Sequence, residues 1–573
     1  MSNIRPTNAA MLDRRKFVAG VTAGGVLTLT GSWPQQAAAQ SPEVLRGREF
    51  NLDIVERSVN FTGRARMATT INGGVPGPTL RWREGDEITV RVSNRLDVPT
   101  SIHWHGILLP WQMDGVPGLS FDGIAPGTTF TYRFPVTQSG TYWYHSHSGF
   151  QEQLGLYGAL IIDPLEPDPV AFDAEHVVLL SDWTDEDPMR LFARLKKESH
   201  YYNFNRRTLA DIRADIRENG FAQYRRDRQM WNRMRMTDRD LADVTGATYT
   251  CLMNGQTPAT NWTALFSPGE RIRLRIINGS AMTIFDLRIP GLEMTVVAVD
   301  GQNVEPVTVD EFRIGVAETF DVVVSPASDV AYTLFAQSID RFGFARGTLA
   351  PAPGIVAEVP SLDTPSPLTM ADMGMAMGMD MPAMNHDMAA MNHELASMSP
   401  DSSGSDAPRA AVDMRAANPQ PRYDDPGVGL RDRSWRVLRY GDLQSLSAPM
   451  HMHEPRREVQ LRLTGNMMRY MWSMNGVRFA DADPINLRLN ETVRFVLIND
   501  TMMTHPIHLH GLWSDVITSA GGQRARMHTV MVQPGQRVEY DVTADAPGPW
   551  AYHCHLLYHM DAGMFRVVDV KEG

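Results

Sequence analysis

The segment His553-Cys554-His555-Leu-Leu-Tyr-His559-Met-Asp-Ala-Gly-Met564 brings one thiol, three imidazoles and a thioether together in a short run. Two imidazoles, one thiolate and a weak axial methionine form a blue-copper electron-transfer site, whereas hard ions prefer carboxylates and a closed zinc site needs no distant methionine. Cys554, His559 and Met564 can supply three of these ligands from one strand end and the loop after it. His505 can supply the fourth.

Histidines recur in three further clusters, His103-Trp-His105, His145-Ser-His147 and His505-Pro-Ile-His508-Leu-His510. Alternate residues of an extended strand point to the same face, so each His-X-His pair can place two imidazoles about 7 Å apart on one wall. Four such pairs could surround a cluster of copper ions. An ordinary core histidine pair is the usual alternative, but it accounts for one pair and not for four pairs together with the cysteine.

Cys554 lies between two of these histidines. The same alternation sends its side chain to one side of the strand and those of His553 and His555 to the other. One strand is therefore expected to link a one-electron copper to a multi-copper cluster.

The four motifs resemble those of multicopper oxidases and occur in the same order along the chain. The resemblance implies four copper ions: one type 1, one type 2 and two type 3. It makes Cys554, His505, His559 and Met564 the type 1 ligands, and His103 and His508 the type 2 ligands. The type 3 pair would be held by His105, His145, His147, His510, His553 and His555.

Protons must reach the cluster as well as electrons. Asp114, in Met113-Asp114-Gly115, matches a family carboxylate near the type 2 copper and is the candidate catalytic residue; a simple turn residue is the alternative. Tyr558 departs from the pattern, because some bacterial cuprous oxidases have a carboxylate at that position.

Length and composition limit the classes of protein. A chain of 573 residues is expected to form three or four units. The formal net charge of -12 argues against a nucleic-acid partner, and no polybasic run suggests an anionic membrane surface. If Cys554 binds copper, the only other cysteine, Cys251, has no partner for an intramolecular disulfide.

The N-terminus is similar to a twin-arginine export signal. Arg14-Arg15 precedes a mildly apolar stretch to about Leu29, and Ala37-Ala38-Ala39 offers a cleavage site. The apolar run is too short to span a bilayer, so residues 1–40 are predicted to be a signal peptide and not a membrane anchor. We therefore expect export to the periplasm by the twin-arginine machinery.

Three echoes of one β-pattern determine the expected architecture. An Asn-Gly dipeptide followed by a strand with alternating apolar residues occurs over residues 72–94, 254–278 and 475–499. The sequence thus predicts an all-β chain of three β-sandwiches, which by resemblance are cupredoxin-like domains. Their expected bounds are 41–165, 166–360 and 434–573.

The second echo has no copper ligands. Ala281–Leu287 and Leu334–Ser338 stand where the other two domains carry histidines. The cluster is therefore expected between domains one and three, with domain two as a spacer.

Two insertions interrupt the β-pattern. Residues 188–244 are Arg-rich with helical spacing, which predicts a helical insertion; a solvated cover is its simplest interpretation. Its segment Met189–Phe204 resembles that of CopA-type periplasmic copper-resistance oxidases more than that of laccases.

The second insertion, predicted as a flexible linker over 361–433, is rich in methionine. Thioethers select Cu(I), which favours copper recruitment over core packing or an inert linker. Met450-His451-Met452-His453 and the methionines from Met467 to Met474 are weaker versions of this signal. The main cluster comprises Met370, Met373, Met375, Met377, Met379, Met381, Met384, Met388, Met391 and Met398, with His386 and His393.

These features together predict an exported copper oxidase of the CopA type, which oxidises Cu(I) and reduces O2 to water in copper resistance. Electrons are expected to enter at His505 and His559. A laccase acting on phenols and a copper-sequestering protein without turnover remain alternatives, and nitrite reduction leaves the type 3 histidines unexplained. Periplasmic copper carriers are possible partners.

Overall fold

The computed structural model describes residues 42–375, 412–447 and 454–572. The chain divides into Met1–Gln40 and Ser41–Gly573, and the first of these lies outside the described residues. The predicted signal peptide, the methionines from Met377 to Met398 and the Met450–His453 motif therefore lie outside them too. No helix of the described part is long and apolar enough to cross a membrane.

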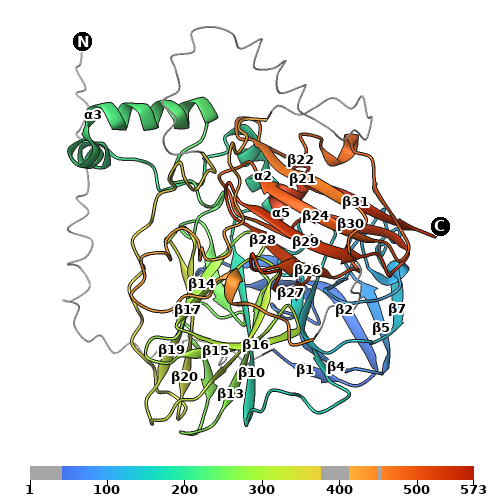
Figure 1. The fold of residues 1–573 in the computed structure, drawn as a ribbon. Coiled ribbons are helices and arrows are strands. Elements are labelled where there is room, and N and C mark those ends of the chain that lie inside the picture. Colours follow the sequence, from blue (N-terminus) through green and yellow to red (C-terminus); the bar gives the residue numbers. More distant parts are fainter. Residues whose placement is uncertain (1–41, 376–411, 448–453, 573) are drawn as a thin grey trace, which may run out of the picture. The chain divides into compact units, whose positions relative to one another are not determined.

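The first domain is built from two sheets, coloured blue in Figure 1. Trp82 packs on Phe134 of the facing sheet with ring centroids 5.7 Å apart, which joins the sheets into a sandwich. One sheet has the order β1 (Val44–Arg46), β4 (Thr79–Arg83), β9 (Tyr157–Asp163), β8 (Gly140–His145), β6 (His103–His105), and the other β3 (Arg66–Ile71), β2 (Glu49–Val59), β5 (Glu87–Asn94), β7 (Thr129–Pro135).

The second domain repeats the arrangement with eleven strands. Phe312 and Phe320, one from each sheet, pack with ring centroids 4.9 Å apart. The sheets have the orders β11 (Thr250–Met253), β10 (Ala174–Trp183), β13 (Ile272–Asn278), β18 (Thr319–Val324), β15 (Met294–Val299), β16 (Gln302–Val309), and β12 (Trp262–Leu265), β20 (Phe344–Ala350), β19 (Tyr332–Ser338), β14 (Phe285–Arg288), β17 (Glu311–Ile314).

The third domain, in orange and red, has the same strand orders as the second. Phe495 and Tyr552 connect its sheets, with ring centroids 5.7 Å apart. The sheets are β22 (Met471–Met474), β21 (Glu458–Asn466), β24 (Thr492–Asn499), β29 (Arg537–Thr543), β26 (Ser514–Ile517), β27 (Arg524–Met527), and β23 (Ile485–Arg488), β31 (Phe565–Lys571), β30 (Gly548–Cys554), β25 (His505–Leu509), β28 (Thr529–Val532). The predicted all-β fold of three cupredoxin-like sandwiches is confirmed.

The Asn-Gly dipeptides explain why each repeat begins alike. Asn72, Asn254 and Asn475 have φ of 52°, 50° and 57°, and each is followed by a glycine that also has positive φ. Two consecutive positive φ values form a tight reversal that matches the twist of paired strands, and Asn and Gly adopt them most readily. Each turn precedes the alternating strands of its repeat.

Helices are few among the described residues. The predicted insertion contains α2 (Pro188–Lys197) and α3 (Leu209–Met234), while α5 (Leu557–Asp561) follows the cysteine strand. The Asp187 side chain caps α2 by accepting from the backbone N–H of Arg190 at 2.9 Å. Most of α3 is exposed and only Trp231 and Met234 are buried, whereas α2 lies beside β22, where Lys196 Nζ donates to the Tyr470 carbonyl at 2.9 Å (Figure 1).

The ends of the predicted linker are packed, in contrast to the expectation for the methionines there. Met373 is fully buried, because the backbone turns at 369–375 and inserts this side chain into the core. At the other end the Ala416 N–H donates to Asp500 Oδ1 at 2.8 Å. Residues 434–447, expected in domain three, also pair with domain two, through Val437 with Glu311 and Ser445 with Val304.

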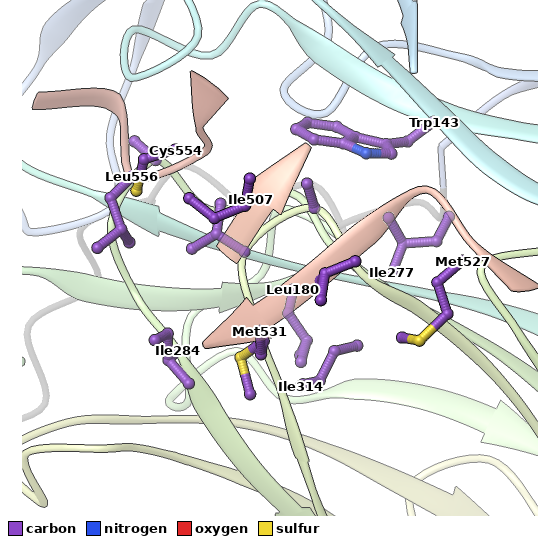
Figure 2. Packing of buried hydrophobic residues seen from close by; sticks show 14 of the residues in the cluster. Trp143, Leu180, Ile277, Ile284, Ile314, Ile507, Met527, Met531, Cys554 and Leu556 are labelled. Carbon is purple, nitrogen blue, oxygen red and sulfur yellow. The ribbon is translucent and has the colours of Figure 1, made fainter. Parts of the chain in front are cut away.

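One hydrophobic core runs through all three domains. Figure 2 shows Trp143 of the first domain, Leu180 and Ile277 of the second, and Ile507 and Cys554 of the third in one cluster. Burial of this extent supplies the main favourable free energy of folding and holds the domains in register. The strands that carry the histidine motifs are therefore fixed relative to one another.

Candidate metal centre

The first centre surrounds Cys554, the last residue of β30. Its Sγ lies 3.5 Å from His505 Nδ1 and 3.8 Å from His559 Nδ1, and the two imidazole nitrogens are 3.2 Å apart. His505 begins the neighbouring strand β25, and His559 lies in α5. Met564 is buried next to them: its backbone N–H donates to the His559 carbonyl at 3.0 Å and its carbonyl accepts from the Cys554 N–H at 3.1 Å.

The outer nitrogens of these two imidazoles are occupied. His505 Nε2 lies 2.7 Å from Thr501 Oγ1, and His559 Nε2 lies 2.5 Å from Asp243 Oδ2. Trp472 stacks on the His559 ring with centroids 3.9 Å apart. Both imidazoles are fully buried. Such outer contacts fix ring orientation, so the Nδ1 atoms and the sulfur are held facing one another.

The second centre contains the eight histidines of the four pairs. Their ring nitrogens converge in groups of three, each with mutual distances below 4.8 Å. In one group, His553 Nε2 lies 3.3 Å from His147 Nε2 and 3.0 Å from His510 Nε2. The groups are His147, His510 and His553; His105, His145 and His555; and His103, His508 and His510.

Strand register accounts for this convergence. His103 pairs with His145 across β6 and β8 in domain one, and His508 pairs with His553 across β25 and β30 in domain three. Alternation along β30 sends Cys554 to the first centre and its two neighbours to the second, as the sequence predicts. The two centres thus share one strand.

Outer contacts also orient the histidines of the second centre. His103 Nδ1 lies 2.8 Å from the Asp114 carbonyl, and His510 Nδ1 lies 2.8 Å from Asp114 Oδ2. His145 Nδ1 lies 2.6 Å from Glu152 Oε2. The Nε2 atoms of His103 and His145 are left buried with no hydrogen-bond partner in the described residues. Buried polar atoms normally have partners, so this pattern fits ligands aimed at a metal ion.

The protonation states favour metal binding. Burial, and then neighbouring imidazoles, lower the pKa of most of these histidines well below the usual range, so the rings are neutral. Burial raises the pKa of the Cys554 thiol, and a bound cation would favour the thiolate. The histidines with a lowered pKa are His105, His145, His147, His505, His508, His510 and His555, together with His553, at about 4.

Three residues at these centres were not found by sequence reasoning: Asp243, Glu152 and His528. Asp243 follows α3 in the helical insertion, and Glu152 follows β8. His528 is buried beside His105 and His508 and has a pKa lowered to about 3 by burial. None belongs to a short motif, and tertiary packing alone brings them to the centres.

The second domain is more than the spacer expected from its lack of histidine motifs. Its Asp243 contacts His559, and its Asp300 Oδ2 accepts the backbone N–H groups of His528 at 3.0 Å and Thr529 at 2.9 Å. Domain two therefore positions residues of both centres, although none of the metal-ligand groups found in the described residues includes one of its side chains.

The donor set matches copper. A sulfur with two imidazoles suits a soft or borderline ion, and converging neutral imidazoles without carboxylate ligands disfavour calcium or magnesium. The buried Nε2 atoms that have no hydrogen-bond partner in the described residues are positions at which a metal ion can bind.

Comparison with known proteins supports the same conclusion. Three models of the multicopper oxidase family match residues 53–167, 174–352 and 452–573. A copper resistance protein A homolog of Pseudomonas syringae pv. tomato is 56% identical over 589 residues, covering 98% of this chain and 99% of that protein. Copper resistance protein A of Escherichia coli is 54% identical over 601 residues, with the same coverage.

A solved structure shows the same fold. Fet3p, described as a multicopper oxidase that functions in iron import, superposes with a TM-score of 0.65 at 20% identity, covering 92% of this chain and 91% of its own. Full-length relatives, three matching family segments and converging copper-type ligands lead to one conclusion: the chain belongs to the multicopper oxidase family.

Proposed function

We propose that this protein is an exported copper-resistance oxidase that takes electrons from Cu(I) and uses O2 as the acceptor. Three relatives that are 54–56% identical over nearly the whole chain are copper resistance proteins by name, which supports this role. Bound copper would supply one-electron oxidation at the first centre and four-electron reduction of O2 to water at the second.

The geometry supports a specific distribution of ligands. Cys554, His505, His559 and Met564 would hold type 1 copper, and His103 and His508 type 2 copper. The distances among Cys554, His505 and His559 support the first set. The type 3 pair would be held by two groups, His105, His145 and His555, and His147, His510 and His553.

The environment of His559 supports Cu(I) over a phenol as the electron donor. A phenol needs an accessible imidazole edge, but this ring is fully buried, lies under Trp472 and has its Nε2 against Asp243. The Asp243 carboxylate beside this ring adds negative charge, which favours a cation as the donor. The arrangement therefore favours a metal ion over a phenol.

Carboxylates beside the second centre can hold protons. Asp114 Oδ2 contacts His510 Nδ1, and we assign Asp114 to proton delivery at this atom. Tyr558 is buried and burial raises its pKa further, so its hydroxyl stays protonated. Glu152 contacts His145 Nδ1 and provides a buried carboxyl group in domain one. Domain three has no carboxylate at position 558, where some bacterial cuprous oxidases have one and this chain has Tyr558. Burial raises the pKa of Glu152, which favours its protonated form.

A rate comparison tests the proposal. Oxygen uptake would be measured with Cu(I), in the presence of a Cu(II) chelator, and with 2,6-dimethoxyphenol. We expect faster turnover of Cu(I), and Asp243→Ala to slow Cu(I) oxidation while phenol oxidation stays or rises. Glu218→Gln, an exposed carboxylate of the same insertion, is the control. Faster phenol turnover would indicate a laccase, and Cu(I) binding without oxygen uptake a sequestering protein.

Delivery and location complete the proposal. Residues 1–40 would direct export to the periplasm by the twin-arginine machinery, and the methionines of 377–398 would collect Cu(I), from solution or from periplasmic carriers. Arg14→Lys together with Arg15→Lys should leave precursor in the cytoplasm. Normal periplasmic accumulation of that variant would show that another route is used.

A further inference from the structure

His528 is a buried histidine beside the second centre that no His-X-His pair contains. It connects β27 to β28, and its ring centroid lies 4.7 Å from that of His105 and 5.7 Å from that of His508. One ring nitrogen from each of these three residues lies within 4.8 Å of the other two. This spacing is the same as that of the groups formed by the motif histidines.

One side of the His528 ring is anchored away from the centre. Its Nδ1 lies 3.1 Å from Thr529 Oγ1 and 3.5 Å from Asp300 Oδ2. A proton on Nδ1 can be donated there, which leaves the lone pair on Nε2. Nε2 is buried and has no hydrogen-bond partner in the described residues. A neutral core histidine would normally use this acceptor, because a buried acceptor without a hydrogen bond destabilises the folded state.

The chain makes room for this ring next to a motif histidine. Gly106 follows His105 with φ of +79°, and a Cβ added there would lie 2.4 Å from His528 Cδ2 and 2.8 Å from its Nε2. Only glycine allows the imidazole to approach this closely, and the approach places Nε2 beside the end of β6.

His508 has one nitrogen left for a metal. Its Nδ1 lies 2.6 Å from the His528 carbonyl, so only Nε2 is free, and that atom is buried without a partner in the described residues. His508 belongs to two groups: one with His103 and His510, the other with His105 and His528. A copper ion on His508 Nε2 can therefore be approached by His528 from the side of His105.

We propose that His528 Nε2 is an additional ligand of the copper ion that His508 holds. This inference rests on the proposed copper assignment. It extends the set of copper ligands beyond the four His-X-His pairs to a histidine elsewhere in the third domain. Asp300 and Thr529 hold the ring in place. The alternative is a histidine that only fills space between Tyr142 and Trp513, whose rings lie 6.1 and 5.9 Å away.

Copper binding of the intact, loaded protein tests this inference. His528→Gln and His528→Ala would be compared with wild type by metal analysis during titration with a copper chelator. We expect both variants to release one copper ion at a chelator concentration at least about 10-fold lower, while the blue absorption is unchanged. His176→Gln is the matched control, a histidine bonded to the Leu265 carbonyl in domain two. Release identical to wild type would overturn the proposal.

A second measurement needs no variant to fold. Pulsed electron paramagnetic resonance of the non-blue Cu(II) in wild type should detect three coordinated imidazoles. Two imidazoles would overturn the proposal for His528 alone, since the copper assignment would stand. Wild-type protein without blue absorption or non-blue Cu(II) would overturn the copper assignment and this inference with it.

Discussion

Asp243 Oδ2 and His559 Nε2 are 2.5 Å apart, so a carboxylate of the second domain touches a histidine of the third that we propose as a type 1 copper ligand. The hydroxyl of Tyr470 donates to the same oxygen at 2.7 Å. Asp243 Oδ1 is buried and has no hydrogen-bond partner in the described residues. The helical insertion thus contributes directly to the surroundings of the first centre, and this contact can be measured electrochemically.

Asp243→Asn should raise the reduction potential of the type 1 copper. A carboxylate that accepts from the imidazole stabilises the oxidised, more positive site better than an amide does. The difference between a charged and a neutral hydrogen bond is about 1.4 kcal/mol, or about 59 mV for one electron. Redox titration of the blue band measures it, with Glu218→Gln as control. An unchanged or lower potential would contradict the contact.

Cys554→Ser should abolish the blue absorption and oxidase activity while the protein stays folded. The serine hydroxyl is a poor ligand for a soft metal, and the sulfur lies on the strand that joins both centres. Absorption spectra, copper content and oxygen uptake would be compared with Cys251→Ser, which replaces the other buried cysteine. Turnover in Cys554→Ser would refute the assignment of the first centre.

Glu318→Gln should flatten the pH dependence of stability. Burial raises the pKa of Glu318 to about 8, whereas an unfolded glutamate titrates near about 4.3. The folded state therefore binds this proton more tightly, so its stabilisation is complete below about pH 4 and is lost as pH rises through about 8. Glutamine keeps the neutral form, and its amide oxygen can accept from the Gly315 N–H.

The measurement is the free energy of unfolding of both proteins from about pH 5 to about pH 9 at equal copper loading. Wild type should lose stability across this range, by about 1.4 kcal/mol for each pH unit that separates the folded from the unfolded pKa, and Glu318→Gln should lose less. Equal slopes would show that Glu318 does not titrate in this window.

Deleting residues 376–400 should raise KM for Cu(I) and leave kcat nearly unchanged. The deletion starts after Met375 because Met373 is buried and its loss would leave a cavity. If the methionines collect the substrate, their loss removes uniform binding and not transition-state stabilisation. Phenol oxidation should stay the same or increase.

A full-length variant with serine at Met377, Met379, Met381, Met384, Met388, Met391 and Met398 separates chemistry from length. It should match the deletion in KM. Unchanged cuprous kinetics in both variants would make the segment an inert linker, and equal loss of both activities would indicate a structural role.

Short-range pattern was sufficient to predict most of the fold. Asn-Gly turns and alternating strands are local signals, and they predicted three sandwiches. The preference of the segment from His553 to Met564 for copper likewise follows from the types and the spacing of its residues. Where a side chain is placed by its own strand, as in His103 and His105, the sequence contains the information.

Asp243, Glu152 and His528 could not be predicted in this way. Asp243 meets His559 across 316 residues of sequence, and no pattern at either residue specifies the other. His528 is a lone histidine, whose ordinary interpretation is core packing. Met373 was misjudged for the same reason, because its glycine- and aspartate-rich surroundings resemble a free linker but pack against the core. Such contacts depend on how the domains dock.

The division of the histidines between the two outer domains has a consequence for biosynthesis. Each group of the second centre that is composed of motif histidines draws on residues before 150 and after 500. The growing chain cannot assemble such a group until its last segment has been made and has docked onto the first. Copper bound there would stabilise the docked state by RT ln(1 + [L]/Kd), and only a chain that contains both outer domains can gain this stabilisation. Metal occupancy of these groups therefore requires that the first and the third domain are both present and docked.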